Sequence, residues 1–238
     1  MALPKLNDTP KYDIVIPSTK MKTRFRPYLV KEEKILLLAI ENGDAKQISN
    51  AVIDLIVACV DNVSAKDLTT YDMDYLFCQI RSKSVGETSK LLIRCEDTEC
   101  NHNTEVIIDI SKAGVDLSEK IENMIPLNSQ ITVEMKHLSY YEAMEILDNE
   151  TESETQTIEN TVLRSLKAIH TEEERIDLKD ESKENIKNFI DQMTSSQYLK
   201  LKKFVANTPR VKLKAEWNCE GCGKPQTMTL EGLQDFFQ

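Results

Sequence analysis

The chain has 238 residues, of which 40% are hydrophobic and 29% charged, and its net charge is −10 at pH 7. This length can bury a substantial core in one large domain or two small ones, and the composition is that of an ordinary globular protein. The excess of 40 acidic over 30 basic residues argues against nucleic acid as the main partner, because phosphate binding needs concentrated Lys and Arg.

The sequence gives no sign of a membrane segment. No apolar run approaches the roughly 20 residues that span a bilayer, and the N-terminal residues lack the apolar core of a signal peptide. We therefore expect a cytosolic protein that has no membrane as a partner.

Residues 1–88 are predicted to form an extended segment followed by a helical region. Two strands, over 12–16 and 22–26, flank a turn, and Pro27 ends the second. Three helices follow, over 31–41, from Asp44 to Cys59, and from about Thr69 to the stop at Val85-Gly86. Cys59 and Cys78 lie inside the second and third helices, where we expect them to be buried as small apolar residues.

Residues 89–136 change to a β pattern. Strands are predicted over 90–94 and 104–110, on either side of Cys95-Glu-Asp-Thr-Glu-Cys100, and a third over 131–136. Residues 137–208 then read as a charged helical insertion, with apolar stripes over 158–169, 186–193 and 198–205.

The last residues return to a β pattern. Residues 211–217 alternate strictly, Cys219-Glu-Gly-Cys222 forms the turn, and 226–230 is the return strand, before a short helix over 230–237. The predicted fold is α+β, mainly helical with short antiparallel strands. It has three parts: 1–88, a zinc-ribbon-like β unit of 89–136 with 209–238, and the insertion 137–208.

The two cysteine pairs at hairpin tips predict a metal site formed by Cys95, Cys100, Cys219 and Cys222. A structural zinc ion takes four thiolates in a tetrahedron, and a Cys-x-x-Cys turn supplies two of them. Alternatives are a redox-active pair, an iron–sulfur cluster, reduced thiols without metal, or His102 in place of one cysteine. Zinc is the preferred interpretation because two facing hairpins make a zinc ribbon.

Motifs for enzyme chemistry are missing from the sequence. It has no Gly-rich phosphate loop, no Gly-x-Ser-x-Gly and no His-Glu-x-x-His, and its three histidines are scattered. A zinc ion with four thiolates has no open position for water or substrate. We therefore predict a non-enzymatic protein with no catalytic or cofactor-binding residues besides the zinc ligands.

Several segments of the sequence match one family of proteins, namely residues 1–6, 16–19, 25–39, 71–87 and the terminal cysteine turn ending in Leu233-Gln-Asp-Phe-Phe. On these segments the chain resembles tail baseplate hub proteins from T-even-like myophages. The resemblance spans most of the chain outside residues 148–195, and residues 25–39 and 71–87 carry its most specific stretches.

This resemblance implies a hub subunit or a chaperone-like hub-assembly factor. Its partners would be other phage baseplate hub and tail proteins, with no small-molecule substrate, and a homo-oligomer is compatible with the sequence. Assembly in the host cytoplasm and a place in the virion tail baseplate are the implied locations. The alternatives are a zinc-ribbon adaptor that binds protein or nucleic acid, and a redox protein that uses Cys219 and Cys222.

Overall fold

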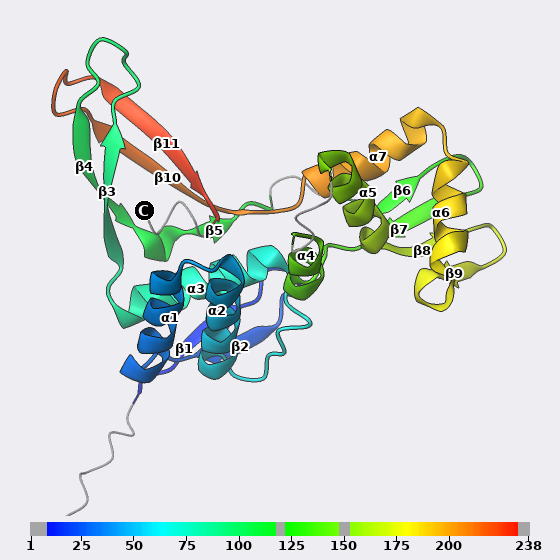
Figure 1. The fold of residues 1–238 in the computed structure, drawn as a ribbon, viewed down its shortest axis with the longest axis horizontal. Helices are drawn as coiled ribbons and strands as arrows, with labels where there is room; N and C mark the ends of the chain where they lie inside the picture. The colour runs from blue at the N-terminus through cyan, green and yellow to red at the C-terminus, as the bar shows by residue number, and fades with distance from the viewer. Residues whose placement is uncertain (1–8, 118–121, 148–152, 233–238) are drawn as a thin grey trace, which may run out of the picture. The chain divides into compact units, whose positions relative to one another are not determined.

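The computed structural model describes residues 9–117, 122–147 and 153–232 and has the α+β fold predicted from the sequence (Figure 1). The chain forms two compact units, Met1–Asp116 with Arg210–Gln238 and Leu117–Pro209. The helices of the described residues are α1 (Val30–Asn42), α2 (Ala45–Cys59), α3 (Thr70–Ser84), α4 (Tyr140–Leu147), α5 (Glu154–Ser165), α6 (Lys183–Asp191) and α7 (Ser195–Ala206). The strands are β1 (Tyr12–Val15), β2 (Lys22–Phe25), β3 (Thr88–Arg94), β4 (Asn103–Asp109), β5 (Gly114–Val115), β6 (Met124–Pro126), β7 (Thr132–Met135), β8 (Leu166–His170), β9 (Arg175–Asp177), β10 (Val211–Asn218) and β11 (Pro225–Glu231).

The three helices of the first unit begin and end where the sequence predicts. Helix α1 ends at Gly43, whose φ of 71° is a left-handed conformation that suits glycine. Asp44 caps α2 by accepting hydrogen bonds from the backbone amides of Lys46 and Gln47. Helix α3 packs against α2 and buries most of its apolar side chains, and Cys59 and Cys78 are both buried in this core, as expected.

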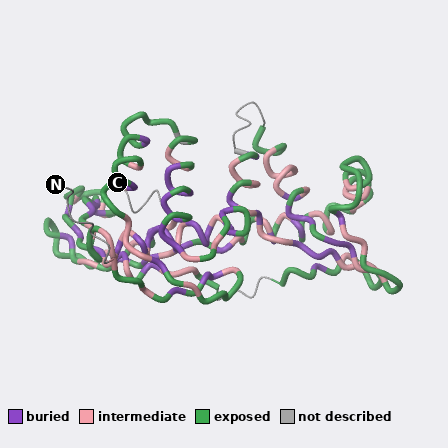
Figure 2. The backbone as a smooth tube through the Cα atoms, turned by 90° about the horizontal axis from the view of Figure 1, so that it is seen from below, coloured by how far each residue is buried: buried purple, intermediate pink, exposed green. Residues whose placement is uncertain are grey.

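Two antiparallel hairpins, β3–β4 and β10–β11, complete the first unit, and β5 pairs with β10. Buried residues alternate with more exposed ones along β3, β4 and β10, and Figure 2 colours the backbone by this burial. The inward residues of both hairpins share one hydrophobic cluster, so strands more than 100 positions apart in the sequence pack together. The cluster includes Leu91, Ile93, Val106, Ile108, Val211, Leu213, Ala215 and Leu230.

The second unit is a four-stranded antiparallel sheet in the order β6-β7-β8-β9, covered by helices. Val133 from the sheet, Val162 from α5 and Leu201 from α7 are fully buried in its core. This strand pairing differs from the grouping that the sequence predicts. The strand at Thr132–Met135, grouped by sequence with the cysteine hairpins, pairs here with β8.

The predicted helical stripe over 158–169 is wrong after Ser165. Helix α5 ends there, and Leu166–His170 form β8, which is paired on both sides by β7 and β9. A short apolar run fits a helix or a strand equally well. Here the run is a strand because two neighbouring strands satisfy the hydrogen bonds of its backbone. The predicted terminal helix over 230–237 lies largely outside the described residues, and its first two positions, Leu230 and Glu231, belong to β11.

Glu134 on β7 is the most strongly paired carboxylate of the second unit. Its oxygens lie 2.7 Å from Lys167 Nζ, 2.9 Å from His170 Nε2 and 3.1 Å from Arg175 Nη2, and the residue is only 9% exposed. Hydrogen bonds from Lys167 and His170 lower the pKa of Glu134 to about 2, against the opposing effect of burial. The cluster therefore links β7 to β8 and β9 through charge.

Glu134→Gln is expected to lower the free energy of unfolding by about 2 kcal/mol at neutral pH, because the charged acceptor is lost. In the wild type, the pKa of Glu134 is lower in the folded than in the unfolded chain. Its contribution is thus present above pH about 4.5 and lost as the pH falls toward 2. Denaturant titrations between these pH values should therefore show the difference between variant and wild type shrinking with acid.

Glu145→Gln is the matched control, since Glu145 pairs with Arg164 at an exposed position. Its effect should stay within about 0.5 kcal/mol at every pH. A Glu134→Gln protein with wild-type stability at pH 7 would contradict the assigned role.

Candidate metal centre

The tips of the two long hairpins position the four predicted cysteines. Cys95 directly follows β3, and its backbone N–H donates to the carbonyl of His102 across the turn, at 2.8 Å. Cys219 directly follows β10, and its N–H donates to the carbonyl of Lys224 at 2.9 Å. Cys100 and Cys222 lie inside the respective turns. Each hairpin therefore presents two sulfurs at one end of a rigid strand pair.

The structure brings all four cysteines together. Their Sγ atoms lie within 4.8 Å of one another, and the described residues contain no other group of three or more His, Cys, Asp or Glu side chains arranged in this way. Cys95 Sγ lies 3.8 Å from Cys222 Sγ, and Cys100 Sγ lies 3.7 Å from Cys219 Sγ. A tetrahedron with Zn–S bonds of about 2.3 Å has sulfur–sulfur edges of about 3.8 Å. The spacing therefore fits one metal ion held by sulfurs from both hairpins.

Backbone amides prepare one of these sulfurs to carry charge. The backbone N–H of Cys222 has the strongest influence on the Cys219 thiol and lowers its pKa. Burial raises this pKa, and the N–H of Gly221 lowers it further. The result is a pKa of about 6 for Cys219. At Cys95, by contrast, a backbone hydrogen bond from Asp97 is the largest single influence and lowers the pKa. Burial and the three neighbouring thiols together outweigh it and raise the pKa to about 12. A divalent cation would resolve this competition by accepting all four sulfurs as thiolates.

Contacts around the sulfurs tie the two turns together. Lys224 forms an ion pair with Asp97, and the N–H of Glu96 donates to Oε1 of Gln226 at 3.2 Å. Thr104 Oγ1 lies 3.9 Å from Cys219 Sγ. These residues cannot be identified from the sequence, because polar residues in turns carry no pattern that distinguishes them from solvated ones.

His102 is not part of the sulfur cluster. Its side chain is 46% exposed, with Nε2 4.0 Å from a carboxylate oxygen of Glu220. The Cys219-x-x-Cys222 turn joins two strands, whereas a thioredoxin-like pair needs a helix N-terminus. The geometry thus favours metal binding by cysteine alone over the redox alternative.

Gly221→Ala is expected to disturb the centre, because the new Cβ would lie 2.6 Å from His102 Cβ and 3.1 Å from Cys100 Sγ. The turn would have to shift, and we expect a loss of about 1–3 kcal/mol in stability together with weaker metal retention. Thermal unfolding with and without a chelator measures both effects.

Gly114→Ala provides the control, since a Cβ at Gly114 meets nothing within 4 Å and its φ is ordinary. It should leave metal content and the chelator response unchanged. Equal behaviour of the two variants would show that the space at Gly221 does not matter.

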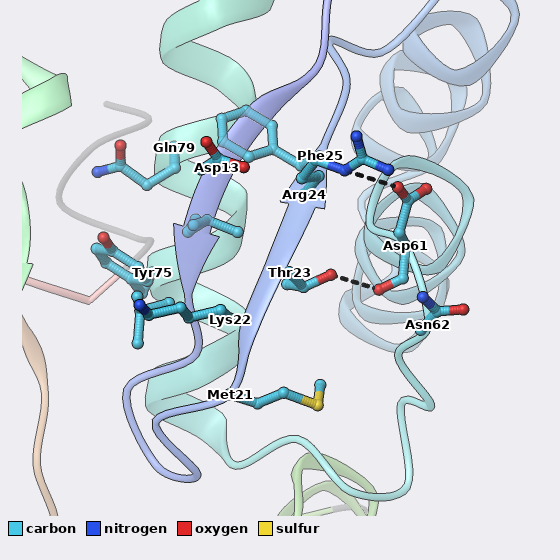
Figure 3. A pocket seen from close by; sticks show the side chains of 12 residues that line it. Asp13, Met21, Lys22, Thr23, Arg24, Phe25, Asp61, Asn62, Tyr75 and Gln79 are labelled. Carbon is cyan, nitrogen blue, oxygen red and sulfur yellow. Dashed lines mark hydrogen bonds and ion pairs between the residues drawn. The ribbon is translucent and has the colours of Figure 1, made fainter.

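A groove of about 880 Å³ lies beside the β1–β2 hairpin (Figure 3). Its other lining residues are Tyr75 and Gln79 of α3 and the pair Asp61-Asn62 that follows α2. Asp61 in its lining already serves the fold. Lys11 Nζ lies 2.7 Å from a carboxylate oxygen of Asp61, and Thr23 Oγ1 donates to the Asp61 carbonyl at 2.6 Å. The described lining residues contain no histidine or cysteine, so they offer no nucleophile–base pair built on these residue types.

None of the helices in the described ranges combines the length and the apolar character that a bilayer span requires. A family model described as T4 bacteriophage base plate protein matches residues 9–238. Comparison with curated protein sequences and with solved structures gives no significant match. Because the family match covers nearly the whole chain and includes both cysteine hairpins, the chain belongs to the T4 bacteriophage base plate protein family.

Proposed function

We propose that this protein is a non-enzymatic hub subunit or hub-assembly factor of the phage tail baseplate. The observation that carries the proposal is the family match over residues 9–238. Other baseplate and tail proteins are the partners that the family implies, and hub proteins are the ones we propose among them. Assembly would take place in the host cytoplasm.

The four-cysteine cluster supports a structural zinc ion as part of this proposal. The cluster spans both hairpins, and its sulfur spacing matches a zinc tetrahedron. Four thiolates fill the coordination sphere, which leaves no position for substrate and agrees with a non-enzymatic role. The metal would fasten the β3–β4 hairpin to the β10–β11 hairpin. Elemental analysis of the purified protein should find about one zinc per chain.

The functional proposal is tested by affinity capture from infected cells. A tagged copy of the full chain should retain baseplate hub proteins, whereas a tag on an unrelated phage protein should not. Capture without any hub protein, in cells where the hub is being assembled, would contradict the proposal.

Mass spectrometry of purified virions separates the two forms of the proposal. A hub subunit should appear in the particles in a fixed ratio to other hub proteins. An assembly factor should be captured from infected cells and be missing from the particles.

A further inference from the structure

Helix α1 exposes several large apolar side chains in the described part of the chain. Ile35, Leu37, Leu38 and Ile40 are 57%, 50%, 60% and 47% exposed. Only Glu32 and Ala39 of this helix are buried. An ordinary surface helix keeps its apolar residues on one side and its polar residues on the other, whereas a helix that is apolar all round is covered by another element.

The sequence of this exposed face is symmetric about its middle. Residues 34–41 read Lys-Ile-Leu-Leu-Leu-Ala-Ile-Glu. Around the point between Leu37 and Leu38, Ile35 lies as far on one side as Ile40 on the other. Lys34 and Glu41 lie equally far out, with opposite charge. Spacings of three, four and seven residues put Lys34, Leu37, Leu38 and Glu41 on one face of the helix, opposite Ala39.

The two charges at the ends of this pattern have no ion-pair partner among the described residues. Lys34 and Glu41 are exposed, and neither forms an ion pair within the residues that the structure describes. The neighbouring Lys31 and Glu32, by contrast, are already paired with each other. Lys34 and Glu41 therefore remain available to an outside partner at the two ends of an apolar surface.

We propose that a second copy of this chain covers the face, with the two α1 helices packed antiparallel about a two-fold axis near Leu37 and Leu38. In this register Leu37 meets Leu38 of the second copy, and Ile35 and Ile40 lie on the two flanks of the contact. Lys34 of each copy then faces Glu41 of the other. A two-fold interface uses the same patch on both subunits, so it needs a patch that complements itself. Residues 34–41 meet this requirement in both shape and charge.

A helix of 13 residues buries less area than a standard interface of about 800 Å² per partner. We therefore expect an equilibrium in the roughly micromolar range. Light scattering coupled to size exclusion, with the zinc-loaded full chain at concentrations from about 1 to 100 μM, should show the mass rise from 27.2 kDa toward twice that value.

Charge reversal tests the register directly. Lys34→Glu and Glu41→Lys each put like charges opposite each other twice in a dimer, and each should weaken dimerisation about tenfold or more. The double variant Lys34→Glu/Glu41→Lys restores both pairs and should dimerise like the wild type. An equimolar mixture of the two single variants should form a heterodimer, because one then carries only acidic and the other only basic ends.

Leu38→Glu should also abolish the dimer, and Leu92→Glu is its control. Leu92 is 71% exposed on β3, so the same substitution there should leave the mass unchanged. Circular dichroism must show the same helix content in all variants. A wild type that stays monomeric at the highest concentration would overturn the proposal. The proposal would also be overturned if the dimer formed equally well with Leu38→Glu and with the charge reversals. Binding of a different protein to α1 in place of a second copy would overturn it as well.

Discussion

Cys219→Ser is expected to purify with far less than one zinc per chain and to lose at least about 3 kcal/mol of stability. The substitution removes the sulfur that the backbone amides of Cys222 and Gly221 favour as a thiolate. The three remaining cysteines cannot complete the tetrahedron, and serine is a poor zinc ligand. Elemental analysis and denaturant unfolding, performed on the same preparation, measure both effects.

The size of this effect follows from the position of the ligands in the chain. Cys95 and Cys222 are 127 residues apart, and Cys100 and Cys219 are 119 apart. A metal that joins such distant residues removes much freedom from the unfolded chain, and its binding energy adds to folding because the site does not exist there. The second unit, Leu117–Pro209, lies between the two cysteine pairs in the sequence. Its residues therefore account for most of the chain that the metal would close into a loop.

Cys59→Ala is the control for this experiment. Cys59 is 2% exposed in α2 and lies outside the sulfur cluster, so its loss should reduce stability without reducing zinc content. A chelator should lower the unfolding midpoint of the wild type and of Cys59→Ala but not that of Cys219→Ser. A Cys219→Ser protein that keeps its zinc and its midpoint would rule out the proposed ligand set.

The hairpins and the first three helices could be predicted because local signals specify them. Asp44 and Thr69 mark helix starts, Gly43 marks a stop, and strict alternation marks Val211–Asn218. The clustering of the cysteines also followed from sequence, since two cysteine turns at hairpin tips have one common geometry in which all four sulfurs meet. These features depend on residues near one another in the chain or on one chemical rule.

The second unit was harder to predict because its pattern is decided by distant residues. Leu166–His170 is a strand only because β7 and β9 lie on either side of it. Likewise, the cluster around Glu134 unites charges from three strands, and the acidic and basic residues of this region look like solvated surface in sequence. The exposure of the apolar residues of α1 has no sequence signal either, because a run of Ile and Leu alone does not tell what covers it.

Asp72→Ala is expected to cost about 3 kcal/mol, the other large effect in this protein. Asp72 is fully buried, and its carboxylate accepts three hydrogen bonds. Two come from the backbone N–H and hydroxyl of Thr69, at 3.0 and 2.7 Å, and cap helix α3. The third comes from the N–H of Ser18, at 2.9 Å, in the turn of the β1–β2 hairpin.

The substitution therefore acts at two places at once. It removes the partner of the helix cap, and it leaves the N–H of Ser18 and the N–H of Thr69 without the acceptor that burial requires. Asp54→Ala is the matched control, because Asp54 is exposed on α2 and should change stability by no more than about 0.5 kcal/mol. Hydrogen exchange distinguishes the effect at the hairpin from that at the helix. Faster exchange at Ser18 and Thr69, with β10–β11 still protected, would locate the damage at this carboxylate, whereas uniform loss of protection would show that Asp72 supports the whole unit.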